Sequence, residues 1–166
     1  MITPINSINV SKLDQYVHPI TKEAAIEVAS NIRDDDRREL EEGHGLTPYE
    51  YLVNIEAKNK DCVYFEVPNG KIAGMAGVDS SGEFQGMVWM LCTDAINEFP
   101  VTFARESKRW IELQTQPLLW NYMDPRNKVH KKLLKFLGFK FLREVPFGPN
   151  QLPFIEFCRV RRSRRS

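Results

Sequence analysis

Three side chains in the sequence have the chemistry for proton transfer. Tyr122 ends a short apolar run, and a phenol there could act as an acid. Glu66 lies on a predicted hairpin and His130 on a predicted helix, and either could act as a base. Each also has a plainer interpretation: Tyr122 as a half-buried core residue, Glu66 as an outward-facing strand residue, and His130 as a surface residue among lysines. We therefore treat Tyr122 and Glu66 as weak catalytic candidates only.

The remaining histidines and the cysteines give no metal or disulfide pattern. His18 and His44 have no partner at metal-ligand spacing, so we expect no metal. Cys62, Cys92 and Cys158 are far apart and lie in apolar surroundings. An odd, scattered set of cysteines favours neither a disulfide framework nor a zinc site. A reducing cytosol is the expected compartment.

The clearest local structure is predicted for the stretch Leu118–Phe141. Leu118–Met123 is an apolar run with aromatic content, typical of a strand, and the Asp-Pro pair that follows ends it. Asn127 is placed to cap a helix whose leucines share one face and whose lysines share the other. Gly138 is a C-terminal stop for that helix. The alternation of residues after it predicts a further strand.

The rest of the chain alternates predicted helices and strands. A chain of 166 residues is long enough for one compact domain, and no apolar run approaches the roughly 20 residues that span a bilayer. The N-terminus has no basic segment followed by an apolar one, so we expect no secretory signal. We expect one α/β domain over residues 1–158, with 1–11 as an N-terminal arm and a mixed sheet of about six or seven strands covered by helices on both faces. Helices are predicted at 21–32, 34–43, 47–60 and from Asp94 or Asn97 to Gln116; strands are predicted at 12–18, 62–67, 71–78, 86–91 and 154–158, with a loop at 146–153.

The net charge of +1 predicts no global attraction to nucleic acid, but the last eight residues are strongly basic. Residues 159–166 form an arginine-rich tail that is either a solvated end or a contact for nucleic-acid phosphates, with strong salt dependence. The arginines concerned are Arg159, Arg161, Arg162, Arg164 and Arg165.

The order of the predicted elements resembles the GNAT acyltransferase fold along nearly the whole chain. The succession strand, Asn127, helix, Gly-Phe, strand is similar to the C-terminal half of that fold, with the family's Gly-Phe pair at 138–139. The family's aromatic position then falls on Leu134. By this resemblance the weak candidates for contacts to acyl-CoA are Leu91, Cys92, Thr93, Asn121 and Asn127.

A narrower resemblance is to the GNAT-like proteins of tailed bacteriophages, including the internal virion protein A family of short-tailed phages. It covers about residues 33–141 and rests on four segments: DRRELEEGHGLTPYEYL, KIAGMAGV, VWMLCTDAI and LLWNYMDPRNKVHKKLLKFLGF. This resemblance implies a role in virion morphogenesis or genome ejection. It also implies other phage virion proteins as partners, and a location in the host cytoplasm, the virion or both.

Two departures from the GNAT enzymes favour a fold that does not catalyse acyl transfer. Those enzymes hold the diphosphate with a Q/R-x-x-G-x-G/A loop, but the junction at 92–100 contains no glycine, and Asp94 and Glu98 bring negative charge to it. Leu134 stands where many of these enzymes carry a tyrosine, and a leucine cannot protonate a departing thiolate. We therefore expect a non-catalytic phage virion or assembly protein without a cofactor. Two alternatives stay open: a GNAT-type N-acetyltransferase using acetyl-CoA, with a strand splay near 90–92 holding the thioester carbonyl, and a basic-tailed nucleic-acid-binding accessory protein.

Overall fold

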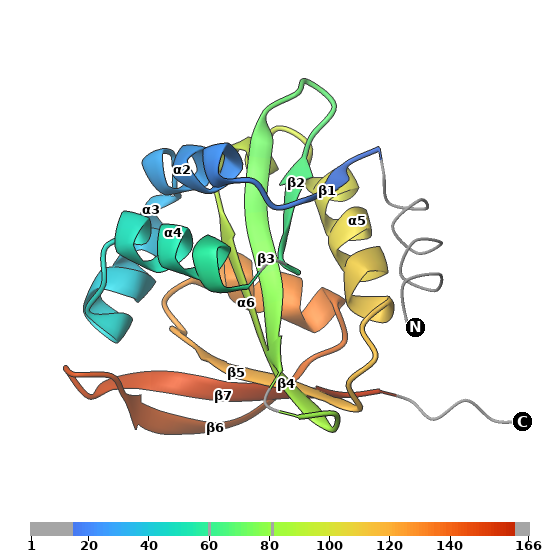
Figure 1. Ribbon diagram of the computed structural model, residues 1–166. Helices are drawn as coiled ribbons and strands as arrows, with labels where there is room; N and C mark the ends of the chain where they lie inside the picture. Colours follow the sequence, from blue (N-terminus) through green and yellow to red (C-terminus); the bar gives the residue numbers. More distant parts are fainter. Residues whose placement is uncertain (1–14, 60, 81, 162–166) are drawn as a thin grey trace, which may run out of the picture.

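A computed structural model describes residues 15–59, 61–80 and 82–161 (Figure 1). The predicted arm at 1–11 and the first three residues of the strand predicted at 12–18 lie outside these residues. The elements are β1 (Val17–Pro19), α2 (Lys22–Ser30), α3 (Asp34–Arg38), the π-helical turn η1 (Glu39–His44), α4 (Pro48–Lys58), β2 (Val63–Glu66), β3 (Ile72–Ser80), β4 (Gln85–Cys92), the 3₁₀ turn η2 (Asp94–Asn97), α5 (Pro100–Glu112), β5 (Leu118–Met123), α6 (Lys128–Phe136), β6 (Lys140–Phe147) and β7 (Leu152–Val160).

Side-chain caps fix where the helices begin. The Thr21 hydroxyl accepts the first free N–H of α2, at 3.1 Å from Ala24 N. Thr47 and Glu50 form a reciprocal capping box at the start of α4, as their spacing predicts. Asn127 caps α6, as predicted, and Gly138 follows that helix with a φ of +94°.

The seven strands form one mixed sheet in the order β1-β2-β3-β4-β5-β7-β6. Every neighbouring pair is antiparallel except β4 and β5, which are parallel. Helices α2 and α4 lie side by side against one face of the sheet, and α5 lies against the other (Figure 1). The predicted fold class, a single α/β domain with a mixed sheet and helices on both faces, is confirmed.

Two hydrophobic cores lie on opposite faces of the sheet. One packs α5 and α6 against the sheet and includes Phe103, Trp110 and Leu134. The other packs α2 and α4 against the sheet and includes Leu52 and Trp89. The side chains of β4 alternate between these two cores, so this strand is covered on both faces.

The loop predicted at 146–153 is wrong in extent, because β6 and β7 continue through both prolines. Pro146 and Pro153 lie opposite one another in the ladder, and only residues 148–151 form the turn. Proline is tolerated here because β6 is the edge strand and Pro153 lies near the start of β7. Gly148, with a φ of +72°, and Gln151, with a φ of +51°, supply the left-handed backbone that reverses the chain.

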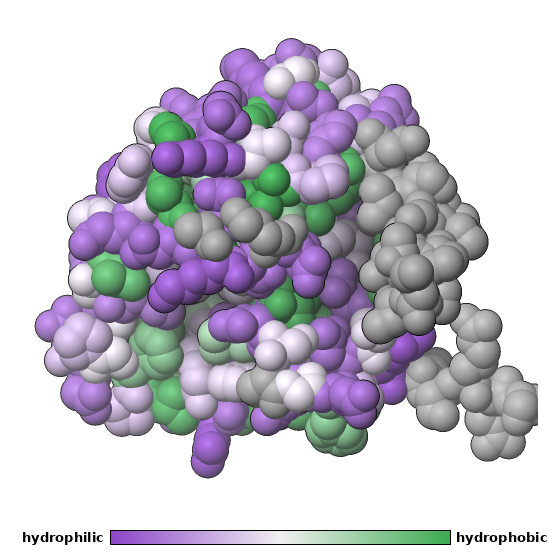
Figure 2. Space-filling view, viewed as in Figure 1, coloured by the Kyte–Doolittle hydropathy of each residue, from purple (hydrophilic) through white to green (hydrophobic). Residues whose placement is uncertain are grey.

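On the face shown in Figure 2, hydrophobic residues are scattered among hydrophilic ones. Among the residues that the structure describes, no helix is both long and apolar enough to cross a bilayer.

Candidate functional site

The two central parallel strands separate after a short ladder. β4 and β5 pair over only three positions, the last of which is Met87↔Trp120. One residue further along, the Asn121 side chain donates its Nδ2–H to the Val88 carbonyl at 2.8 Å. An amide side chain thus takes the acceptor that a continuing ladder would use, and the strands part beyond it.

The separation leaves an open edge on β4. Thr93 donates its N–H to Ala73 of β3 at 2.9 Å, whereas Cys92 donates its N–H away from β3, to Asp36 Oδ2 at 2.7 Å. Backbone groups alternate in direction along a strand, so Met90 turns its N–H and C=O to the same edge as Cys92. These groups of Met90 lie beyond the β4–β5 ladder and face the gap between the two strands.

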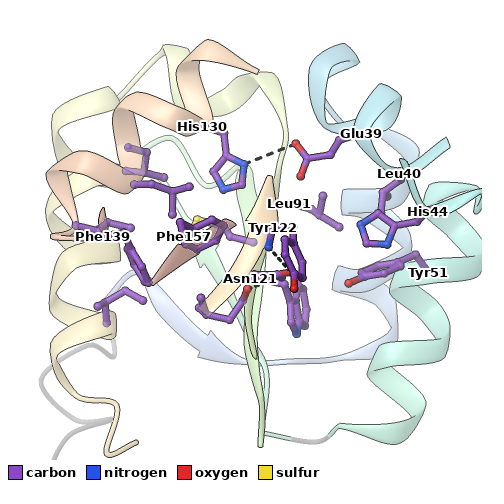
Figure 3. A pocket seen from close by; sticks show the side chains of 17 residues that line it. Glu39, Leu40, His44, Tyr51, Leu91, Asn121, Tyr122, His130, Phe139 and Phe157 are labelled. Carbon is purple, nitrogen blue, oxygen red and sulfur yellow. Dashed lines mark hydrogen bonds and ion pairs between the residues drawn. The ribbon is translucent and has the colours of Figure 1, made fainter. Parts of the chain in front are cut away.

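A cavity of about 40 Å³ lies in this gap, between the open edge of β4 and helix α6 (Figure 3). Residues from β4, β5, α6, η1, α4 and β7 form its wall. The polar and aromatic members of that wall are Glu39, His44, Tyr51, Trp89, Asn121, Tyr122, His130, Phe139 and Phe157.

Glu39 and His130 face one another across the cavity (Figure 3). His130 Nδ1 lies 3.8 Å from Glu39 Oε1, and their side chains are 16% and 10% exposed. Burial raises the pKa of Glu39 and outweighs the opposing effect of His130. Burial alone would lower the pKa of His130, but the neighbouring Glu39 carboxylate raises it. Each group therefore favours the protonated form, and the pair shares a proton over an intermediate pH range.

A second carboxylate, one helical turn before Glu39, is fully paired. Asp36 accepts from Arg33 Nη1 at 2.9 Å, from Asn127 Nδ2 at 2.7 Å and from the Cys92 N–H. These bonds tie α3 to the end of β4 and to the first turn of α6. Asn127 also donates to Glu39 Oε1, at 3.4 Å, so the same network holds the Glu39 side chain at the cavity.

Aromatic rings line the cavity on the side of η1 and α4. His44 lies edge-on to Tyr51, with ring centroids 5.6 Å apart, and Tyr51 lies edge-on to Trp89 at 6.3 Å. Burial, followed by the charges of Asp79 and Glu39, raises the pKa of Tyr51 to about 12. Burial also lowers the pKa of His44. These rings are consequently uncharged at neutral pH.

At the junction after β4, the side chains of Thr93 and Glu98 bond to other residues of the chain. The Thr93 hydroxyl donates to the Ile72 carbonyl at 2.7 Å and accepts the Ala95 N–H at 3.2 Å, so Thr93 caps the turn η2. Glu98 is paired on the surface with Lys71, at 3.1 Å, and accepts from Asn69 at 2.9 Å. Its charge is therefore offset and does not stand alone at the junction.

The structure brings together some of the residues named from the sequence. Leu91, Asn121 and Tyr122 line the cavity, whereas Cys92 and Thr93 lie just beyond it and are buried. Asn127 is buried as the cap of α6 and contacts Glu39 rather than the cavity itself. The roles assigned to these five residues, and that of Tyr122 in proton transfer, stay predictions.

Glu66 lies away from this group. It is on β2, two strands from β4, and its Oε1 is 2.9 Å from His18 Nε2. His130 is not the surface residue that the surrounding lysines indicated, because its ring turns inward to Glu39. Sequence reasoning also missed Glu39, His44 and Tyr51. Their only sequence signal was a position near Gly43 and Gly45, where the chain changes direction between two helices.

Two arginines of the C-terminal segment, Arg159 and Arg161, lie within the described residues. Arg159 belongs to β7 and pairs with Leu119, and Arg161 donates to the Thr115 carbonyl at 3.2 Å. Arg162, Arg164 and Arg165 lie outside the described residues, and a nucleic-acid contact stays a prediction. Within the described ranges, no group of three or more His, Cys, Asp or Glu side chains could hold a metal ion.

No family model matches the sequence, and no curated protein matches it. Solved structures do. A GNAT-family acetyltransferase from Streptococcus agalactiae aligns with a TM-score of 0.66 at 10% identity, over 89% of this chain and 95% of that one. The chain has the GNAT acyltransferase fold. A putative acetyltransferase from Salmonella typhimurium, solved with its cofactor acetyl-CoA, aligns with a TM-score of 0.64 at 13% identity, over 90% and 95% of the two chains. A spermidine N-acetyltransferase from Vibrio cholerae, in complex with CoA and spermine, aligns with a TM-score of 0.62 at 12% identity, over 87% and 94%.

These likenesses correct the function expected from the sequence. The three solved structures named above are acetyltransferases, which favours the acyltransferase alternative over a non-catalytic virion protein. No finding supports a phage origin or the internal virion protein A family. The expectation of a virion protein gave the glycine-free junction too much weight and could not take the open β4 edge into account.

Proposed function

We propose that the chain is a GNAT-type N-acyltransferase that transfers an acyl group from acetyl-CoA to an amine. The observation that carries this proposal is the open edge of β4 beside a cavity with an acid–base pair. A thioester lying along this edge could accept the Met90 N–H at its carbonyl oxygen, as a paired strand would. Acetyl-CoA supplies the activated acyl carbonyl as a thioester.

The residues fit the two ends of acetyl-CoA unequally. The thioester end fits the gap, because the Met90 backbone groups, Leu91 and Asn121 surround it. The junction after β4 lacks the glycine loop that GNAT enzymes use for the diphosphate. What remains is the first turn of α5, where no side chain caps the helix and the N–H groups of Val101 and Thr102 precede the first intrahelical bond, which Phe103 donates. A diphosphate held only there would bind weakly, so we expect a low affinity for acetyl-CoA.

The chain's own residues account for the proton movements of the reaction. His130, in its neutral form, can accept a proton from an incoming ammonium group, and Glu39 holds the imidazole in place. The amine nitrogen then forms a bond to the acyl carbon while the C–S bond breaks, and the nitrogen loses a second proton to solvent so that the product amide is neutral. The proton held on His130 can pass to the departing sulfur, either directly or through Tyr122, which lines the same cavity. Leu134 takes no part in this proton transfer.

The experiment is an acetyl-CoA assay paired with two substitutions at one position. The wild-type protein should release free thiol from acetyl-CoA when a panel of primary amines is supplied, and calorimetry should detect acetyl-CoA binding. Met90→Ala keeps the backbone N–H and should bind acetyl-CoA as the wild type does. Met90→Pro removes an N–H that is outside the β3 ladder, but it also fixes φ and places its ring at the open edge of this central strand, so it should weaken binding by at least about tenfold. Circular dichroism checks that this variant keeps the fold of the wild type. No acetyl-CoA binding by the wild type, or equal binding by both variants, would contradict the proposal.

A further inference from the structure

One wall of the cavity combines a carboxylate with uncharged rings. Glu39 is buried between His130 on α6 and the rings of His44 and Tyr51 on η1 and α4 (Figure 3). Tyr122 closes the wall from β5. A buried carboxylate in a cavity that aromatic rings also line can bind an organic cation by charge, and by cation–π attraction where the cation meets a ring face.

The contact between Glu39 and His130 leaves the Glu39 carboxylate able to accept a further bond from such a cation. At 3.8 Å, the two facing atoms are further apart than the 2.7–3.2 Å typical of a direct hydrogen bond. The nearest other donor to Glu39 is Asn127 Nδ2, at 3.4 Å, which is also long. Glu39 thus keeps acceptor capacity toward the cavity, whereas Asp36, one turn earlier, has its oxygens saturated by close donors.

The size of the cavity limits what can enter. A water molecule needs about 10–15 Å³ of such space, so a cavity of about 40 Å³ admits an ammonium group and a methylene or two. A ring or a branched carbon next to the nitrogen would not fit beside the apolar residues that also line the cavity, among them Leu133 and Leu134 of α6 and Leu137 just after it.

We propose that this wall is a subsite for the ammonium head of a slender, unbranched primary amine, with Glu39 as its anionic partner and His130 as the acceptor of its proton. The assignment of this amine as the acyl acceptor rests on the proposed function. Binding of the ammonium head does not, because it needs only residues of this chain.

The site should also link binding to proton release. Both groups hold a proton more readily than usual, and a cation lying beside the pair, in the cavity, would favour the loss of a proton. The charged or titratable groups that face the pair from the neighbouring elements are Arg33 and Asp36 at α3, His44 on η1, Tyr51 on α4, Cys92 on β4 and Tyr122 on β5. Asp36 and Arg33 neutralise one another at 2.9 Å, and burial raises the pKa of the Cys92 thiol well above its ordinary value.

The test uses the protein without acetyl-CoA and three small-molecule probes. The probes are n-butylamine as its ammonium salt, n-butanol as its neutral isostere, and cyclohexylamine as a bulky amine. Binding is followed by NMR shifts of the backbone amides of Leu91 and Tyr122, and proton release by calorimetry in buffers of different ionisation enthalpy. We expect n-butylammonium to bind with release of up to one proton, and the other two probes to bind at least about tenfold more weakly.

Three variants separate the roles within the subsite. Glu39→Gln should remove the preference for the ammonium over the alcohol, and His130→Gln should keep that preference but abolish proton release. Glu41→Gln is the matched control, since Glu41 lies on the same turn, is exposed and does not line the cavity. Equal binding of butanol and butylammonium by the wild type, or an unchanged preference in Glu39→Gln, would overturn the subsite. Charge-selective binding without any thiol release would leave the subsite standing and remove the proposed acyl transfer.

Discussion

Asp36 and Glu39 are carboxylates one helical turn apart, both buried beside the same two elements, β4 and α6. Asp36 receives three donors at 2.7–2.9 Å, from Arg33, Asn127 and the Cys92 backbone. Glu39 has only long contacts, at 3.4 and 3.8 Å, and lies at a cavity. A buried charge with complete pairing fixes structure, whereas one with incomplete pairing retains the capacity to bind something else. Asp36 therefore belongs to the framework that holds the site, whereas Glu39 is available for its chemistry.

Removing the saturated carboxylate should have the largest effect. Asp36→Ala leaves the buried Arg33 guanidinium with only its longer 3.6 Å contact to Asp35, and leaves the Cys92 N–H without its acceptor, so we expect a loss of about 3–5 kcal/mol in the free energy of unfolding. Urea unfolding followed by circular dichroism measures it. Asp35→Ala is the matched control, because Asp35 makes exposed pairs with Arg38 and Arg33 worth at most about 1 kcal/mol. Equal losses in the two variants would show that Asp36 does not anchor α3.

A third carboxylate, Asp124, extends the comparison with Asp36 and Glu39, because its hydrogen bonds come from a single residue. Its oxygens accept from the Arg126 backbone at 2.9 Å and from the guanidinium at 2.7–3.1 Å. Burial would raise its pKa, but the bonds from Arg126 lower it below the ordinary value of 3.8. A lowered pKa contributes stability above the unfolded-state value, and that contribution is lost as pH falls through the folded-state value.

Asp124→Asn should therefore cost about 1–2 kcal/mol at neutral pH, at the lower end because nearly half of the Arg126 side chain is exposed. The difference from wild type should shrink as pH falls from 3.8 through the lowered folded-state pKa, where the carboxyl of the folded wild type becomes protonated. A difference that stays constant with pH would mean that the variant perturbs the turn by shape rather than by charge. Glu42→Gln, which removes the other partner of Arg126, should change stability by less than about 1 kcal/mol.

Sequence reasoning was accurate where local patterns decide the structure. The hairpin between β2 and β3 and the Asn127 cap followed from turn chemistry and capping rules that operate within a few residues. The succession of elements was enough to reach the GNAT fold. The extent of the β6–β7 hairpin failed because tolerance of Pro146 depends on its lying in an edge strand, which only the sheet order reveals.

The site could not be predicted to the same degree because it is assembled from distant positions. Glu39 and His130 are 91 residues apart in the sequence. The sequence around each residue gives no sign that the other lies close to it in space. His130 lies among lysines that suggest solvent, yet capping by Asn127 sets the phase of α6 so that its ring faces the cavity. The opening of β4 is equally invisible in sequence, since it depends on the Asn121 side chain reaching Val88 across the sheet.

The smallest expected effect on stability is that of the incompletely paired carboxylate. Glu39→Gln keeps an acceptor oxygen for Asn127 and removes a charge whose burial is costly, so we expect a change of less than about 1 kcal/mol at neutral pH. Glu39 and His130 both have raised pKa values, so the folded protein binds more protons than the unfolded chain, and the contribution of the pair is lost as pH rises through the folded-state values. Unfolding measured in acid and near neutral pH should show the wild type losing more stability than the variant over that interval. A loss of several kcal/mol in Glu39→Gln, comparable to that of Asp36→Ala, would make Glu39 part of the scaffold and erase the distinction between the two carboxylates.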